Sequence, residues 1–142
     1  MTAKKYLQQI KALDIKIKQK MEEREDLYSR AISTGSRELK ADVVQTSVNG
    51  DKVGGAIDRY VDLEKEIQTL IDRYIVQRNV IINQIQSIPD PRYEEILYLR
   101  YVKYMRLEEI ACTMVKTNGQ PYSYDHILRI HGEALKKFAE IM

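Results

Sequence analysis

An uninterrupted helical pattern of apolar residues from Ala56 to Ile88 is the strongest constraint on how this chain can fold. Apolar side chains recur every three or four residues at Tyr60, Leu63, Ile67, Leu70 and Tyr74, and then every seven residues at Ile81 and Ile88, with Ile71, Val80 and Ile85 widening the stripe. This spacing predicts one amphipathic helix, which at about 1.5 Å per residue spans about 50 Å. Such a helix has no core of its own, so it must pack against another helix of the chain, a second copy, or both.

A second helical pattern runs from Ala3 to about Ile32. Its apolar residues occupy coiled-coil seam positions at Tyr6, Ile10, Leu13 and Ile17, and again at Leu27, Tyr28 and Ala31. Lys20 and Arg24 interrupt that seam. The two patterns together predict that residues 1–88 form a long helical hairpin or coiled coil, through which copies of the chain associate into a homo-oligomer.

The segment between the two patterns, 33–55, is expected to be a loop. It contains "STGS", "SVNGD" and "VGG", in which Gly, Ser and Asn occur at the density typical of turns. Within it, "LKADVVQTSV" has no 3.6-residue period. That stretch is predicted to be a short strand or an extended strap over the helices.

The sequence "SIPDPRY" predicts a domain boundary. Pro89 and Pro91 both disfavour continuation of the preceding helix, and Asp90 followed by Pro91 is typical of a new helix start. Three shorter helical patterns follow, over 92–105, over 106–114, and from Tyr124 towards Ile141 after a Ser123 cap. The sequence therefore predicts an all-α protein in which residues 89–142 form a three-helix helix-turn-helix domain after the long helices of residues 1–88.

Composition excludes several classes of protein. The net charge is +2, and residues 89–142 carry 8 Lys+Arg against 8 Asp+Glu, so bulk charge does not indicate a nucleic-acid partner. Cys112 is the one cysteine; it excludes an intrachain disulfide and is expected to pack in the core of its helix. No stretch is long and apolar enough for a membrane span, and no Walker loop or metal-ligand cluster occurs. We therefore expect no membrane partner, no metal, no cofactor and no enzymatic activity.

Two stretches resemble region 4 of bacterial sigma factors. "ILYLRYVKYMRLEEIA" matches its first two helices, and "YSYDHILRIHGEALKKF" matches its capped third helix, including the "ALKK" ending. The whole chain is also similar to small phage proteins that combine a "VQTS-x-x-GDK-x-G" loop, a "VDLE" segment and a "DPRY" junction. These proteins resemble the late-gene transcription regulators of Gram-positive phages, the ArpU and RinA type. The resemblance implies a phage-encoded regulator that binds promoter DNA in the cytoplasm of a bacterial host.

The resemblance also implies which residues contact double-stranded DNA. Region 4 places base and phosphate contacts at positions occupied here by Tyr124, Asp125, Leu128 and Arg129. Leu128 departs from the family, which often has a basic residue there, and the turn 111–123 is longer than usual. That turn is expected either to act as a wing in which Lys116 touches phosphate or to change the angle between the two helices. His126 and Lys136 are further predicted contacts with phosphate, the alternatives being solvent for His126 and the helix C-terminus for Lys136.

The residues themselves leave an alternative open. An arginine such as Arg129 can bond a guanine edge and Asp125 can accept from cytosine, yet the two are also four residues apart and can simply pair on the helix surface. His126 and His131 are five residues apart and do not form a metal pair. The alternative function is a protein-interaction module that docks on RNA polymerase or another regulator without touching DNA.

Overall fold

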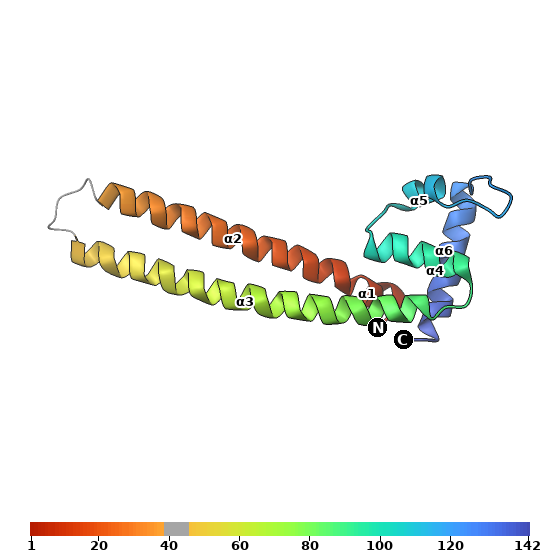
Figure 1. Cartoon of the computed structure of the whole chain (residues 1–142), viewed down its shortest axis with the longest axis horizontal. Coiled ribbons are helices and arrows are strands. Elements are labelled where there is room, and N and C mark those ends of the chain that lie inside the picture. The colour runs from red at the N-terminus through yellow and green to blue at the C-terminus, as the bar shows by residue number, and fades with distance from the viewer. Residues whose placement is uncertain (39–45) are drawn as a thin grey trace. The chain divides into compact units, whose positions relative to one another are not determined.

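The chain is mostly helical, which confirms the all-α class. The computed structural model describes residues 1–38 and 46–142, and the side chains of residues 1–33 and 54–142. Its helices are α1 (Ala3–Leu7), α2 (Gln9–Glu38), α3 (Thr46–Gln86), α4 (Pro91–Leu97), α5 (Leu107–Thr113) and α6 (Tyr124–Ala139), shown in Figure 1. A π-helical turn, η2 (Tyr98–Val102), follows α4 directly. These ranges contain no strand, and an isolated antiparallel bridge joins Val115 to Pro121.

The predicted loop over 33–55 is wrong for most of its length. Helix α2 continues to Glu38, and α3 begins at Thr46, ten residues before Ala56. Gly54 and Gly55 lie inside α3 with no atom near the place where a Cβ would stand. Glycine disfavours a helix by only about 1 kcal/mol relative to alanine, so it does not end one by itself. Residues 39–45, which include most of the predicted strand or strap, lie outside the described residues of the chain.

The chain divides into two compact units, which we call the terminal unit (Met1–Leu13 and Tyr74–Met142) and the middle unit (Asp14–Arg73). This division differs from a boundary at Pro89. Residues of the predicted first domain, such as Leu7 and Ile85, are fully buried in the same core cluster as Phe138. The prolines do end α3, but Ile88 packs into that core and therefore joins the two sides of the junction.

The middle unit consists of parts of α2 and α3 around a narrow apolar seam. Among the side chains of this unit that the structure describes, the buried ones are Ile17, Leu63, Ile67 and Leu70. Lys20 and Arg24, which interrupt the apolar spacing, form cross-helix ion pairs instead: Lys20 Nζ lies 3.2 Å from Glu66 Oε2, and Arg24 Nη1 lies 3.1 Å from Glu64 Oε1. The interruption of the seam is thus a place where the two helices pair through charge.

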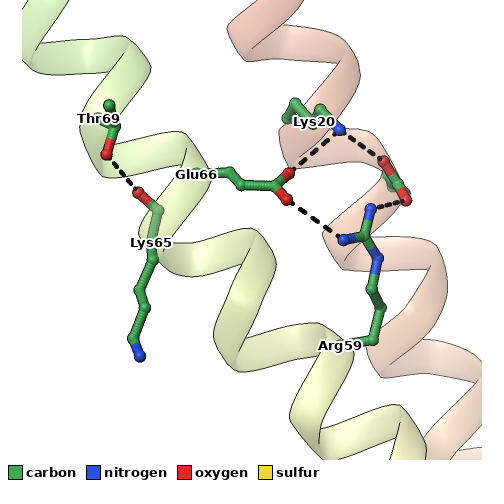
Figure 2. Close-up of polar contacts among 6 residues, drawn as sticks. Lys20, Arg59, Lys65, Glu66 and Thr69 are labelled. Atoms are coloured by element: carbon green, nitrogen blue, oxygen red, sulfur yellow. Dashed lines mark hydrogen bonds and ion pairs between the residues drawn. The ribbon is translucent and has the colours of Figure 1, made fainter.

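The Lys20–Glu66 pair belongs to a cluster of alternating charges with Glu23 and Arg59, of which Figure 2 labels Lys20, Arg59 and Glu66. Arg59 donates from Nη2 to Glu23 Oε1 at 2.9 Å and from Nη1 to Glu66 Oε1 at 3.3 Å. Hydrogen bonding from Lys20 lowers the pKa of Glu66, and the hydrogen bond to Glu23 raises the pKa of Arg59. All four side chains are partly exposed to solvent, so each pair contributes little stability.

The core of the terminal unit is made by α6 packing against α4, α5 and α1. Both predicted helix caps are confirmed: Asp90 Oδ1 accepts from the Arg92 amide at 2.9 Å, and Ser123 Oγ accepts from the His126 amide at 3.2 Å. The expected helix over 92–105 is shorter than predicted, since η2 ends at Val102 and Tyr104 has a positive φ of 59°.

Cys112 is exposed, so its predicted core position is wrong. Ile110 and Ala111 are the buried residues of α5, and Met114 just after the helix is buried as well. Cys112 lies one residue, about 100°, round the helix from Ala111, which turns its thiol away from the core. Val80, expected to widen the apolar stripe of α3, is likewise exposed.

Candidate nucleic-acid interface

The exposed stripe of α6 consists of four residues at helical spacing. Asp125, Arg129, Gly132 and Lys136 follow one another at intervals of four, three and four, which places them on one side of the helix, and all four are exposed. The opposite side is buried through Ile127, Ile130, Ala134 and Phe138. Helix α6 therefore closes the core with one face and offers a polar face to solvent. We call this polar face the α6 stripe.

Two cations of the α6 stripe are unpaired. Among the residues that the structure describes, neither Arg129 nor Lys136 forms an ion pair, whereas Lys137 Nζ lies 3.3 Å from Glu140 Oε2. The surface pair between Asp125 and Arg129, one of the two alternatives open from the sequence, is not formed. The guanidinium of Arg129 is thus available to an outside partner with all five of its N–H donors.

Tyr124 and Leu128 border the α6 stripe. They are 43% and 40% exposed, large fractions for such side chains in a helix that also supplies the core. Leu128 lies one residue, about 100°, round the helix from Arg129. The structure therefore places an apolar edge beside the cations, which suits the thymine methyl of a base pair or an apolar protein surface equally well.

Tyr122 organises the N-terminal side of the site. It is buried, and the His126 ring meets it edge-on with centroids 5.0 Å apart. The Lys116 ammonium lies 5.7 Å from the centroid of the same tyrosine ring. Burial lowers the pKa of His126, and the nearby charges of Arg129, Lys116 and Arg92 lower it further. His126 is therefore half-buried, and its surroundings favour the neutral imidazole, which can accept or donate a hydrogen bond.

The turn before α6 is a small closed loop. The Lys116 amide donates to Gln120 O at 2.8 Å, the Gly119 amide donates to Lys116 O at 2.9 Å, and the Val115–Pro121 bridge closes the base. Gly119 has a φ of 83°, a conformation that disfavours other residues. The loop directs Lys116 back over Tyr122, so this lysine belongs to the N-terminal side of α6.

Arg92 is a component of the site that sequence reasoning missed. It lies at the start of α4, and its charge acts on His126 in α6. Asp90 holds it, with Arg92 Nη2 3.0 Å from Asp90 Oδ2. In the same region Tyr93 Oη donates to Glu133 Oε2 at 2.9 Å. Nothing in the spacing signals these contacts, because they depend on how α4 packs against α6.

His131 is separate from the α6 stripe and belongs to the core side. Its Nε2 shares a 2.9 Å hydrogen bond with Tyr101 Oη, and the two rings stack with centroids 5.8 Å apart. Burial, followed by the charges of Arg100 and Lys4, lowers the pKa of His131 from 6.5 to about 4. No group of three or more potential metal ligands occurs among the residues described.

This pKa predicts acid sensitivity of the terminal unit. Between pH 6.5 and 4 the unfolded chain binds a proton at residue 131 that the folded chain does not bind, so the free energy of unfolding falls as the pH is lowered through that window. We expect the free energy of unfolding to fall by about 1–2 kcal/mol between pH 7 and 4. This is less than the full pKa shift of His131 implies, because its ring is partly exposed to solvent. Urea unfolding at both pH values measures it. His131→Gln should remove this part of the pH dependence and His126→Gln should keep most of it; equal pH dependence in wild type and His131→Gln would contradict the assignment.

Comparisons with protein-family models, with curated proteins and with solved structures found no match. The resemblance to sigma region 4 and to phage late-gene regulators therefore depends on the motifs quoted above. Among the described residues, no helix has the length and apolar character needed to span a membrane.

Proposed function

We propose that this chain is a phage-encoded transcription regulator that binds promoter DNA through α6. In this proposal α4 with η2, α5 and α6 act as a three-helix helix-turn-helix domain, and α6 lies in the major groove. The observation that carries the proposal is the α6 stripe, in which two unpaired cations, Arg129 and Lys136, flank Gly132 on an exposed face. Gly132 has no neighbouring atom within 4 Å of a Cβ position, so a phosphate or base edge can approach the helix backbone there.

The electrostatics support local rather than global attraction to DNA. Residues 89–142 have no net charge. Two of their carboxylates already have partners, because Tyr93 donates to Glu133 and Arg92 pairs with Asp90. Three cations have no carboxylate partner among the described residues: Lys116, Arg129 and Lys136. Lys116 and Arg129 lie towards the N-terminus of α6 and Lys136 lies in its last turn, so these unpaired cations are spread along the helix. Ser123 caps that N-terminus, and the helix dipole adds partial positive charge there.

The salt dependence of binding tests this proposal. We expect the wild-type protein to bind fragments of the phage genome at low salt, with log K falling against log [salt] at a slope of roughly −3 if three phosphates are neutralised. Fluorescence anisotropy of labelled duplexes between about 50 and 200 mM salt measures the slope. Absence of binding at low salt would rule out the DNA function. It would leave the alternative, docking on RNA polymerase or another regulator through the apolar edge formed by Tyr124 and Leu128.

For the middle unit we propose self-association. A groove of about 290 Å³ is lined by Leu27, Tyr28, Ala31, Ile32, Ala56, Ile57 and Tyr60. Tyr28, Ile32 and Ile57 each keep about half of their surface exposed. Charged residues of both signs, Asp26, Arg30 and Asp58, adjoin the groove in sequence, so a two-fold-related copy can pair opposite charges across it.

A stable interface with a second copy needs more apolar surface than the groove alone offers. A stable interface buries about 800 Å² on each partner, more than three half-exposed side chains supply. A second copy can add Val61 and Ile15, which are exposed on the same two helices.

Ile57→Asp should weaken this self-association. A charge placed in an apolar contact raises the dissociation constant, by at least about tenfold for a loss of 1.4 kcal/mol. Sedimentation equilibrium of wild type and variant measures the change, with Ile75→Asp as the control because Ile75 is equally exposed on α3 but lies outside the groove. A monomeric wild-type protein at the highest accessible concentration would contradict self-association.

A further inference from the structure

The terminal unit contains a small polar cavity away from the α6 stripe. It measures about 60 Å³ and is lined by Gln8, Lys11, Arg100, Tyr101 and Tyr104. These side chains come from the α1–α2 junction, from η2 and from the segment after it. One water occupies about 10–15 Å³ of this kind of volume, so the cavity accepts a group larger than a single water.

The cavity lining is basic and contains no acid. Lys11 and Arg100 are its two cations, and in the described residues neither pairs with a carboxylate. Arg100 Nη1 donates to Met105 O at 2.9 Å, which fixes the guanidinium and leaves its other N–H groups free. The Lys11 ammonium lies 5.8 Å from the centroid of the Tyr104 ring. Gln8 adds neutral hydrogen-bonding groups to the lining, and the Tyr101 hydroxyl is engaged with His131.

The surroundings make the cavity more positive. Lys4 and Arg100 both act on His131, the hydrogen-bond partner of Tyr101, and together with burial they keep that imidazole unprotonated at pH 7. A third cation, Lys4, therefore lies close to the same cluster. None of Lys4, Lys11 and Arg100 forms an ion pair within the described residues.

The backbone holds two of the lining residues in uncommon conformations. Arg100 lies in the π-helical turn η2, and Tyr104 has a φ of 59°, in the left-handed region that a bulky side chain rarely adopts. Both features bring a polar side chain to the cavity wall. Segments of this kind are frequent at binding sites.

We propose that this cavity binds a phosphate group. A fixed guanidinium suits the oxygens of a tetrahedral oxyanion through paired N–H bonds, and the Lys11 ammonium, which lines the same cavity, supplies a second charge. The group can come from free phosphate or from the backbone of a nucleic acid. The site is separate from the α6 stripe, so it does not depend on the DNA-binding function proposed for that stripe.

Lys11→Gln tests the site in the full-length chain, because Lys11 is exposed and its loss should leave the fold intact. The matched control is Lys16→Gln, an exposed lysine of the same helix outside the cavity. In the first arm, inorganic phosphate is compared with sodium chloride at equal ionic strength by thermal unfolding and by ³¹P NMR line width. In the second arm, a short labelled duplex is titrated with each protein.

Free phosphate as the source is indicated if phosphate raises the melting temperature and broadens the ³¹P line with wild type and Lys16→Gln but not with Lys11→Gln. A nucleic-acid backbone as the source is indicated if Lys11→Gln weakens duplex binding several-fold relative to Lys16→Gln. The proposal is overturned if Lys11→Gln and Lys16→Gln behave alike in both arms. If neither the wild type nor either variant binds duplex, but phosphate still stabilises the wild type and Lys16→Gln and not Lys11→Gln, only the proposed DNA function is overturned.

Discussion

We expect Phe138→Ala to destabilise the terminal unit by about 3–5 kcal/mol. Phe138 is fully buried on the core side of α6, and the Tyr6 ring from α1 packs against it with centroids 5.9 Å apart. Removing the ring leaves a cavity between segments that are far apart in the sequence. Natural domains are stable by only about 5–15 kcal/mol, so the melting temperature should fall by more than about 10 °C. Circular dichroism during heating measures the change.

Leu128→Ala provides the control for Phe138→Ala. It removes a large apolar side chain from the same helix, but Leu128 is 40% exposed. Its substitution should therefore lower the free energy of unfolding much less than Phe138→Ala does. Leu7→Ala extends the test to the other end of the chain, because Leu7 is fully buried in the same core cluster. If Leu7→Ala leaves the melting temperature unchanged while Phe138→Ala lowers it, residues 1–13 do not belong to the terminal unit.

The helices of this protein were predictable because their signals are local. Apolar residues at intervals of three and four, the Asp90–Pro91 start and the Ser123 cap each lie within one or two helical turns. The structure confirms both caps and the helical class. The compact units were not predictable, because they depend on which buried residues meet in space, and Leu7, Ile85 and Phe138 meet across most of the sequence.

The loop prediction over 33–55 is wrong because the Gly, Ser and Asn content of that segment does not outweigh the long helices on either side of it. Clusters of Gly, Ser and Asn indicate turns when the flanking residues do not form a helix. In α3 a 41-residue helix absorbs Gly54 and Gly55, since each costs only a small part of the helix's packing energy. Lys20 and Arg24 do interrupt the apolar seam of α2, but the spacing does not show that they pair with Glu66 and Glu64 of α3.

About half of the candidate interface follows from sequence. The exposed positions of Asp125, Arg129 and Lys136 are a consequence of helical periodicity once Ile127 and Ile130 are assigned to the core. The roles of Arg92 and Tyr122 are not, because they depend on tertiary packing around His126. Helical periodicity also does not determine whether Arg129 pairs with Asp125, because that depends on where the two side chains lie.

Arg129→Ala should lower the affinity for specific duplex by roughly 5- to 100-fold, since a good contact between arginine and a base edge is worth about 1–3 kcal/mol. Arg129 is exposed and has no ion pair among the described residues, so its removal should leave the melting temperature unchanged. Lys137→Ala is the matched control, because it removes one positive charge from the same helix at a side chain already paired with Glu140. Anisotropy titrations of both variants at one salt concentration, on specific and scrambled duplexes, separate base recognition from charge. Equal losses for the two variants would show that α6 contributes only general attraction to phosphate, and a lower melting temperature for Arg129→Ala would show that the side chain stabilises the fold.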